Sequence, residues 1–381
     1  MYFKPRLSAL SSLLLTLSLL SIGIPAGLLA QDAVQATPSS ATAGDTTFPG
    51  EAWERIENPE SAGFSAVGLA RLSESAARFN TTGMMVVVGG RVLFEYGNVE
   101  ELSYLASVRK SVLAMLYGKY VANDSIDLDL TLEEIGFDDV GGLLEVEKQA
   151  TIRDLISARS GIYHPASNAG DNTDEAPERG SQKPGEYFLY NNWDFNAAGA
   201  IFEQESGMNI YDALEQDLAV PIGMQDFDRS AQEKSGDESR SEHMAYHMWL
   251  STRDMARLGL LMLRHGNWNG EQVVPKEWAE RICSVVTPNA EMNPESTRKG
   301  PFGYGYMWWV WDGEGTPELL KGAYSGMGAF GQFITVIPAL DMVVAHKTAV
   351  PPFSRSVSMG QYLNLIETLL KAHAAEDVDQ E

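Results

Sequence analysis

The chain has 381 residues, 44% of them hydrophobic, so it is long enough for two domains or one large catalytic unit with a sizeable core. Its 52 acidic and 28 basic residues give a formal net charge of −24 at pH 7. Because a strongly negative surface repels phosphate groups, this balance argues against binding to nucleic acid or to anionic membranes. The single cysteine, Cys283, excludes an intramolecular disulfide.

The N-terminal segment predicts export. Residues 1–30 are typical of a signal peptide, because Lys4 and Arg6 precede a run of 24 uncharged residues rich in leucine and serine. We expect cleavage after Ala30, with Ala36 as the alternative position, and delivery to the bacterial periplasm or the outside of the cell. The run is long enough to span a bilayer if it stays uncut, so a retained membrane anchor is the alternative. Residues 31–50 are small and polar and predict a disordered linker.

The segment 51–374 predicts one α+β domain, followed by an acidic tail at 375–381. The expected elements are helices over 66–79, 107–118, 251–263, 275–282 and 358–373, a hairpin over 84–96, and strands over 305–311, 331–337 and 341–345. Because strands come early and late, we expect 51–125 and 251–374 to form one antiparallel sheet flanked by helices. The mainly helical part 126–250 is then an insertion, and the cleft between the two parts is the natural site.

The inserted part 126–250 predicts short helices over 151–157 and 194–205, separated by loops. The loop 167–186 has no periodicity, and long loops of this kind are often lids or binding loops. We expect it to contribute to substrate choice, together with an aromatic wall near Trp193, Tyr304 and Trp308.

The main candidate for chemistry is the pair Ser107 and Lys110. Apolar residues recur with helical spacing after Ser107, so its hydroxyl and the ammonium of Lys110 lie on one face near a helix start. A serine hydroxyl becomes a nucleophile when a neighbour takes its proton, and burial pushes a lysine toward its basic form. The alternative is an N-cap serine beside a surface lysine. The same spacing at Ser296 and Lys299 is followed by Gly300-Pro301 and predicts a solvated loop.

A second candidate is Tyr190, with Asn192 two residues later. A phenol can act as a general base where positive charge or hydrogen bonds lower its pKa, and a lysine one turn from the serine is such a neighbour. Asn192 could orient that lysine or hold a substrate amide. The spacing also occurs at 96–98 and 362–364, but only Tyr190 opens a helix directly after an irregular loop.

A third candidate is the glycine-rich stretch 322–332, which leads into a predicted strand. Its glycines let the backbone come close to a ligand. A strand-edge N–H group there could pair with the N–H of Ser107 as an oxyanion hole. A plain glycine-rich turn is the alternative.

Three motifs in this order resemble those of the serine β-lactamase and penicillin-binding-protein superfamily: Ser107-x-x-Lys110, Tyr190-x-Asn192, and Gly326-x-Gly328 before a strand. The second motif is similar to that of the class C branch, which also holds esterases, D-amino-acid peptidases and 6-aminohexanoate-oligomer hydrolases. The resemblance runs from about 64 to 374. It implies an antiparallel sheet flanked by helices, a helical domain beside it, and the serine in the cleft. We expect no cofactor and no metal.

The resemblance also implies roles. Ser107 would be the nucleophile, Lys110 would assist its deprotonation, and Tyr190 would be the general base that later protonates the leaving group. The N–H groups of Ser107 and Ala329 would form the oxyanion hole, with Gly328 beside the second of them. The reaction would acylate Ser107 and then hydrolyse the acyl-enzyme.

The third motif departs from the family pattern, which is usually Lys-Thr-Gly with a lysine that contacts a substrate carboxylate. Here Gly326 stands in that place, or Tyr324 in a register two residues earlier, and neither is cationic. The similar run 347–349 (Lys-Thr-Ala) lies past the next strand. We therefore expect weak or absent β-lactam turnover, and a small-molecule ester or amide without a recognised carboxylate as substrate.

Other functions stay open on the sequence alone. D-amino-acid peptidase or β-lactamase activity is one, and a non-catalytic cell-wall or β-lactam sensing module on the same fold is another. A metal hydrolase is disfavoured, because His243 and His247 are four apart but Met244 replaces the glutamate of H-E-x-x-H. Membrane contact is expected only if the N-terminal segment stays uncleaved.

Overall fold

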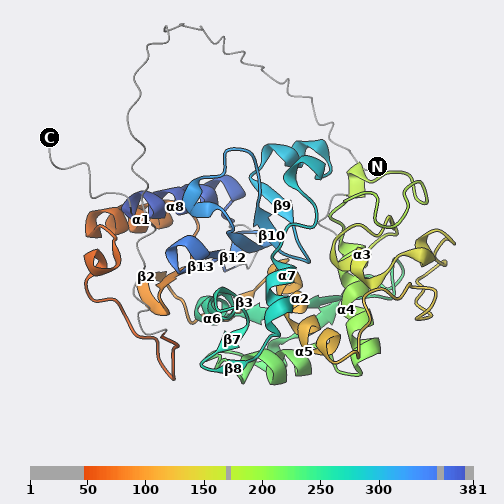
Figure 1. Cartoon of the computed structure of the whole chain (residues 1–381), viewed down its shortest axis with the longest axis horizontal. Helices are drawn as coiled ribbons and strands as arrows, with labels where there is room; N and C mark the ends of the chain where they lie inside the picture. Colours follow the sequence, from red (N-terminus) through yellow and green to blue (C-terminus); the bar gives the residue numbers. More distant parts are fainter. Residues whose placement is uncertain (1–46, 169–172, 350–355, 374–381) are drawn as a thin grey trace, which may run out of the picture. The chain divides into compact units, whose positions relative to one another are not determined.

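The computed structural model describes residues 47–168, 173–349 and 356–373 (Figure 1). They belong to a compact unit that spans 45–381. The predicted signal peptide and acidic tail lie outside the described residues, as does all but the last four residues of the predicted linker. Among the described helices, none is long and apolar enough to cross a membrane.

A seven-stranded antiparallel sheet organises the fold, in the order β2-β1-β13-β12-β11-β10-β9. Its strands are β1 Gly83–Val88, β2 Arg91–Gly97, β9 Phe302–Tyr304, β10 Trp309–Trp311, β11 Tyr324–Gly328, β12 Gln332–Ile337 and β13 Met342–Lys347. β1 pairs with β13 along its whole length, from Gly83 opposite Lys347 to Val88 opposite Met342. Early and late segments of the chain therefore close one sheet, which confirms the predicted α+β class.

Helices cover both faces of this sheet. On one face, α1 Ala66–Arg78 and α8 Met359–His373 pack side by side (Figure 1). Gly68 permits their close contact, because a Cβ there would lie 2.5 Å from Cβ of Ala372. On the other face lie α2 Val108–Ala122 and α6 Thr252–Leu263. Because both faces are covered, every residue of β12 and β13 is buried, and these strands lack an exposed polar face.

The part between α2 and α6 is rich in loops and carries α4 as its main helix. Its elements are α3 Ile152–Ile156, α4 Asn192–Ser206, α5 Ile210–Ala213, and a short ladder that pairs β4 Glu233–Ser235 with β5 Ala245–His247. Its last strand, β6 Trp249–Leu250, pairs with β3 Ser103–Tyr104, which precedes α2 in the chain. After α6 come β7 Asn267–Trp268, β8 Glu271–Gln272 and α7 Lys276–Ile282. α4 contacts both α2 and α3, so it joins this part to the helix that begins after Ser107.

The region 302–328 departs from the sequence prediction. The single strand expected over 305–311 is two strands, β9 and β10, separated by a turn in which Met307 has a φ of 58°. The glycine-rich stretch forms the strand β11, paired with β12 along its length and with β10 at its start. Glycine has a low β propensity, so this strand depends on its neighbours in the sheet rather than on its own residues.

Candidate active site

Ser107 lies at the start of α2, in a backbone turn that does not use its hydroxyl as a helix cap. The residue before it, Ala106, has a left-handed φ of 48°, and Ser107 itself has φ −77° and ψ −7°. The Ser107 side chain makes no capping hydrogen bond to the helix. The interpretation as an N-cap serine beside a surface lysine is therefore wrong, since Lys110 is only 1% exposed.

Lys110 joins the predicted residues into one cluster. Its Nζ donates to Ser107 Oγ at 3.2 Å, to Tyr190 Oη at 2.7 Å and to Asn192 Oδ1 at 2.8 Å. The same ammonium lies 4.2 Å from the ring centre of Tyr190 and 4.4 Å from that of Phe195, within the range of cation–π attraction. Residues about 80 positions apart in the chain thus meet at one buried nitrogen.

The start of α4 positions Tyr190 and Asn192. Asn191 caps the helix by accepting a hydrogen bond from the N–H of Asp194, so Tyr190 leaves the helix axis and Asn192 occupies the first turn. Asp194 is fully buried and accepts a hydrogen bond from Ser160 Oγ at 2.6 Å. Burial raises the pKa of Asp194 well above its usual range. Asn191 and the buried contact between Asp194 and Ser160 thus fix the start of α4 that carries Tyr190 and Asn192.

The backbone of β11 lies directly against the start of α2. A Cβ at Gly328 would lie 2.6 Å from Leu105 O and 2.9 Å from Ser107 N, both backbone atoms. A Cβ at Gly326 would lie 3.0 Å from Ser111 Oγ. Glycine is therefore needed at 328 because two backbones meet there, and the following residue, Ala329, lines the cavity beside Ser107. The plain-turn interpretation of this stretch is wrong.

The Beta-lactamase family matches residues 69–358, which is more than half of the chain. The chain belongs to the Beta-lactamase family. The 6-aminohexanoate-dimer hydrolase of Paenarthrobacter ureafaciens is 24% identical to it over 312 residues, which cover 75% of this chain and 77% of that enzyme. An uncharacterized protein of Alkalihalophilus pseudofirmus is 30% identical over 105 residues, 26% of this chain, and the match spans only 30% of that protein's length.

Solved structures of other hydrolases share the fold. A class C beta-lactamase mutant has a TM-score of 0.59 at 14% identity, over 84% of this chain and 99% of that one. EstCE1, described as a hydrolase with promiscuous acyltransferase activity, has a TM-score of 0.58 at 16% identity, over 82% and 99%. These similarities confirm the predicted β-lactamase/transpeptidase-like architecture, and the chain is a β-lactamase-related hydrolase.

Two side chains near the third motif could stand in for the lysine of other Beta-lactamase family members, and the structure places both away from the cavity. Tyr324 is buried in β11 with its ring 5.5 Å from that of Trp308, so it does not replace the missing lysine. Lys347 is also buried, and its Nζ donates to the carbonyl oxygens of Ser103 at 2.6 Å and Leu250 at 2.5 Å. Burial lowers the pKa of Lys347 to about 7. Through these two hydrogen bonds Lys347, on β13, links the seven-stranded sheet to the β3–β6 pair, and it does not line the cavity.

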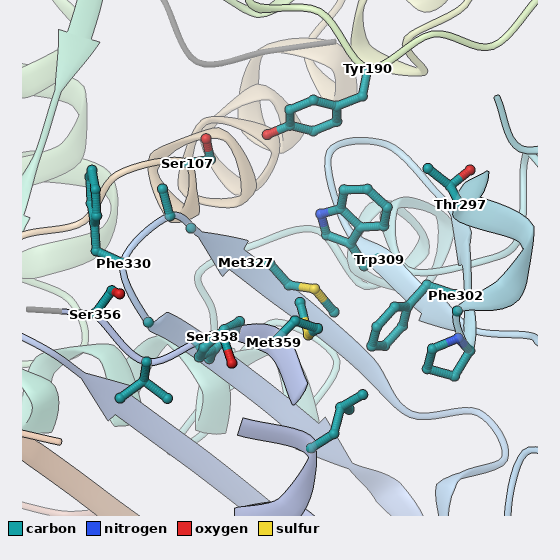
Figure 2. Close-up of a pocket in the computed structure, with 18 residues that line it drawn as sticks. Ser107, Tyr190, Thr297, Phe302, Trp309, Met327, Phe330, Ser356, Ser358 and Met359 are labelled. Carbon is teal, nitrogen blue, oxygen red and sulfur yellow. The ribbon is translucent and has the colours of Figure 1, made fainter. Parts of the chain in front are cut away.

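A cavity of about 670 Å³ opens beside Ser107 and Tyr190 (Figure 2). Its wall continues through Phe302, Trp309 and Met327 toward the start of α8, where it is lined by Ser358, Met359 and Leu363. Its volume is typical of a site for a small molecule. The sequence prediction missed these lining residues, and only the isolated Met327 between two motif glycines signalled a side chain near the site.

The predicted aromatic wall needs correction. Trp193, Tyr304 and Trp308 are all buried in the core, at 0%, 1% and 1% exposure. The Nε1 of Trp193 donates to Asp139 Oδ2 at 2.6 Å, away from the cavity. The wall is instead formed by Trp309 and Phe302, and Tyr304 packs behind them with its ring 5.0 Å from that of Trp309. The sequence Trp-Trp does not reveal which ring faces the substrate.

The predicted binding loop 167–186 is described only in part, because 169–172 lie outside the described residues. Its later half is fixed to the domain: Arg179 pairs with the buried carboxylate of Glu147 at 2.7 Å, and Gly185 N donates to Arg159 O at 2.8 Å. None of its described residues lines the cavity beside Ser107. A role in substrate choice stays a prediction.

The two histidines of the disfavoured metal motif make separate contacts. His243 Nε2 lies 2.8 Å from Asp138 O, and His247 Nδ1 lies 3.0 Å from Tyr104 Oη. His243 instead shares a cluster with Asp139 and Glu242, whose candidate ligand atoms lie within 4.8 Å of one another. Asp139 already accepts hydrogen bonds from Trp193, from Ser241, and from two backbone N–H groups.

Proposed function

We propose that this protein is an exported serine hydrolase that cleaves a small ester or amide through an acyl-enzyme on Ser107. The observation that carries the proposal is the contact of one buried Lys110 Nζ with Ser107 Oγ, Tyr190 Oη and Asn192 Oδ1. Membership of the Beta-lactamase family and the likeness to a 6-aminohexanoate-dimer hydrolase support it. The charged start and apolar run of residues 1–30 support export.

The first half of the reaction acylates the serine. Ser107 Oγ attacks the substrate carbonyl carbon while its proton passes to the phenolate oxygen of Tyr190. A positive charge beside a phenol favours the phenolate, and Lys110 supplies that charge. The negative charge that develops on the carbonyl oxygen is stabilised by the N–H groups of Ser107 and Ala329. The bond to the leaving group then breaks, and Tyr190 returns the proton to the departing oxygen or nitrogen.

The second half releases the acid. Water attacks the acyl carbon, gives one proton to Tyr190, and the ester bond to Ser107 Oγ breaks as that proton returns to the serine. Asn192 holds Lys110 in place through its Oδ1, so the ammonium stays beside both the serine and the tyrosine throughout. β-Lactam turnover is weak or absent in this proposal, because no lysine or arginine is among the described residues that line the cavity.

The test is intact mass after incubation with a fluorophosphonate, which loses fluoride as its phosphorus bonds to an activated serine. We expect one adduct on the wild type and none on Ser107→Ala. A panel of p-nitrophenyl esters, D-alanyl anilides and nitrocefin then assigns the substrate class. A well-folded wild type without an adduct would contradict the proposal and favour a non-catalytic cell-wall or β-lactam sensor. Burst kinetics without turnover would do the same.

A further inference from the structure

Among the described residues, no charged side chain lines the cavity beside Ser107. The 18 described residues that line it include no aspartate, glutamate, lysine or arginine, although these types make up 21% of the chain. Its polar side chains are limited to Ser, Thr and Tyr hydroxyls, and the rest of the wall is glycine or apolar. Away from the Lys110 ammonium at the serine end, a charged group that entered would lose its hydration and meet no described side chain of opposite sign, at a large cost in free energy. The wall therefore selects for an uncharged occupant.

The cavity reaches the apolar layer between the sheet and α8. β10 pairs with β11 only at Tyr324 and Ser325, so in the described residues the later half of β11 faces the cavity on that side. Met327 alternates with Gly326 and Gly328, and its side chain belongs to the core that α8 covers. Figure 2 shows Ser107 and Tyr190 at one end, Trp309 and Met327 below them, and Phe302 and Met359 farther from the serine. A chain or ring that leaves the serine in this direction meets mainly apolar side chains.

The direction of the cavity identifies which half of the substrate enters it. The oxyanion sits between the N–H groups of Ser107 and Ala329, whereas the leaving group must reach the proton donor. In the proposed reaction that donor is Tyr190, whose ring lies 5.4 Å from the ring of Trp309 at an interplanar angle of 31°. Trp309 and Phe302, 6.3 Å apart, continue the wall away from the tyrosine. The leaving group therefore enters the uncharged cavity.

We propose that the cavity bounded by Trp309, Met327, Phe302 and Met359 is a leaving-group site for an uncharged apolar alcohol, so that the preferred substrates are esters of such alcohols. This inference rests on the proposed function, because it uses Tyr190 as the proton donor. In the acylation step Ser107 Oγ bonds to the acyl carbon, the bond from that carbon to the alcohol oxygen breaks, and the oxygen takes the proton from Tyr190. The apolar tail of the alcohol stays against the wall toward α8.

The experiment compares acetate esters that differ only in the alcohol. Ethyl, butyl and hexyl acetate have leaving groups of nearly equal basicity, so differences in kcat/KM report binding of the tail rather than bond cleavage. Each added methylene is expected to raise kcat/KM by up to about fourfold, the equivalent of one buried methylene. The matched charged probe is 6-acetoxyhexanoate, which resembles hexyl acetate but ends in a carboxylate. We expect it to react at least about tenfold more slowly than hexyl acetate. Acid release in a pH-stat measures every ester.

A charge placed in the wall should reverse that preference. Met359 is 37% exposed at the start of α8, so Met359→Lys is tolerated by the fold and puts an ammonium at the far end of the cavity. We expect this variant to lose activity on hexyl acetate and gain activity on 6-acetoxyhexanoate. Met359→Leu keeps the wall apolar and should keep the wild-type preference. Val220→Lys, at a site 70% exposed and outside the cavity, controls for added charge.

The outcomes separate this inference from the proposed function. Loss of all hydrolysis in Ser107→Ala together with a flat alcohol series would keep the serine hydrolase and overturn the leaving-group site. The leaving-group site is also overturned if 6-acetoxyhexanoate reacts as fast as hexyl acetate, or if Met359→Lys and Val220→Lys behave alike. Full hydrolysis by Ser107→Ala would overturn the proposed function itself. Should Met359→Lys fail to fold, the alcohol series and the charged probe on the wild type still test the site.

Discussion

A single methyl group at Gly328 should disable the oxyanion site while leaving the fold intact. The Cβ of Gly328→Ala would lie 2.6 Å from Leu105 O, 2.9 Å from Ser107 N and 3.1 Å from Val108 N, all of them backbone atoms that cannot rotate aside. The clash pushes β11 away from the start of α2. Overpacking of this kind costs about 1–3 kcal/mol of stability. Loss of one oxyanion donor lowers kcat by about 10²–10³-fold.

Two other glycines provide matched controls. At Gly326 the added Cβ would meet Ser111 Oγ at 3.0 Å, a side-chain atom that can shift, so Gly326→Ala should lose less than about tenfold in kcat. At Gly360, in α8, nothing lies within 4 Å, and alanine should leave kcat unchanged and add up to about 1 kcal/mol of stability. The assay is kcat on p-nitrophenyl acetate together with urea unfolding of all three variants. A folded Gly328→Ala protein with wild-type kcat would refute the close approach of β11 to Ser107.

Three further predictions concern titrating groups. Tyr190→Phe keeps the ring but removes the proton carrier, so kcat on p-nitrophenyl acetate should fall by about 10²–10⁴-fold with little change in melting temperature; a smaller loss would refute its role. Lys347 has a folded pKa of about 7 against an ordinary value of 10.5. Between pH 7 and 10.5 the unfolded chain therefore binds more protons than the folded protein, so the free energy of unfolding should rise with pH over that window. Urea unfolding at pH 7 and pH 9 measures this rise, which should be smaller in Lys347→Met. Burial raises the pKa of Asp194 in the folded protein. The protonated side chain therefore contributes to the free energy of unfolding at low pH, and this contribution is lost as pH rises through the raised pKa. Asp194→Asn, which mimics the neutral acid, should be at least as stable as the wild type at pH 7, whereas a strongly destabilised variant would show that the carboxylate is charged.

The residues around the serine could be predicted from sequence because their spacing reflects local geometry. Ser107 and Lys110 are one helical turn apart, so the sequence brings them together without knowledge of the fold. Tyr190 and Asn192 bracket a helix start, which the irregular loop before them reveals. Their meeting with Lys110 over about 80 residues is not a local property, and it was expected only through the resemblance to a family.

The walls of the site could not be predicted in the same way. Trp308 and Trp309 are equivalent in the sequence, yet one is buried in the core and the other lines the cavity. Their assignment depends on the turn at Met307, whose left-handed φ ends one strand and begins the next. The position of β11 also depends on packing. Its glycines have low strand propensity, and the strand is held by pairing with β12 and by close contact with the start of α2. These features are set by packing between distant segments, which local patterns do not encode.

In the proposed reaction, chemistry and selectivity are carried by different parts of the domain. Ser107 and Lys110 come from α2 and Tyr190 from the start of α4, whereas the uncharged wall comes from β9 to β11 and the start of α8. The family's usual third-motif lysine would stand on β11, between these two groups, and Gly326 and Met327 occupy that strand instead. In the proposed reaction, an uncharged β11 leaves the Lys110 cluster unchanged and alters only which substrate groups can bind beside it. Substitutions along the wall should consequently change which ester is cleaved, and substitutions at the Lys110 cluster should change whether any ester is cleaved.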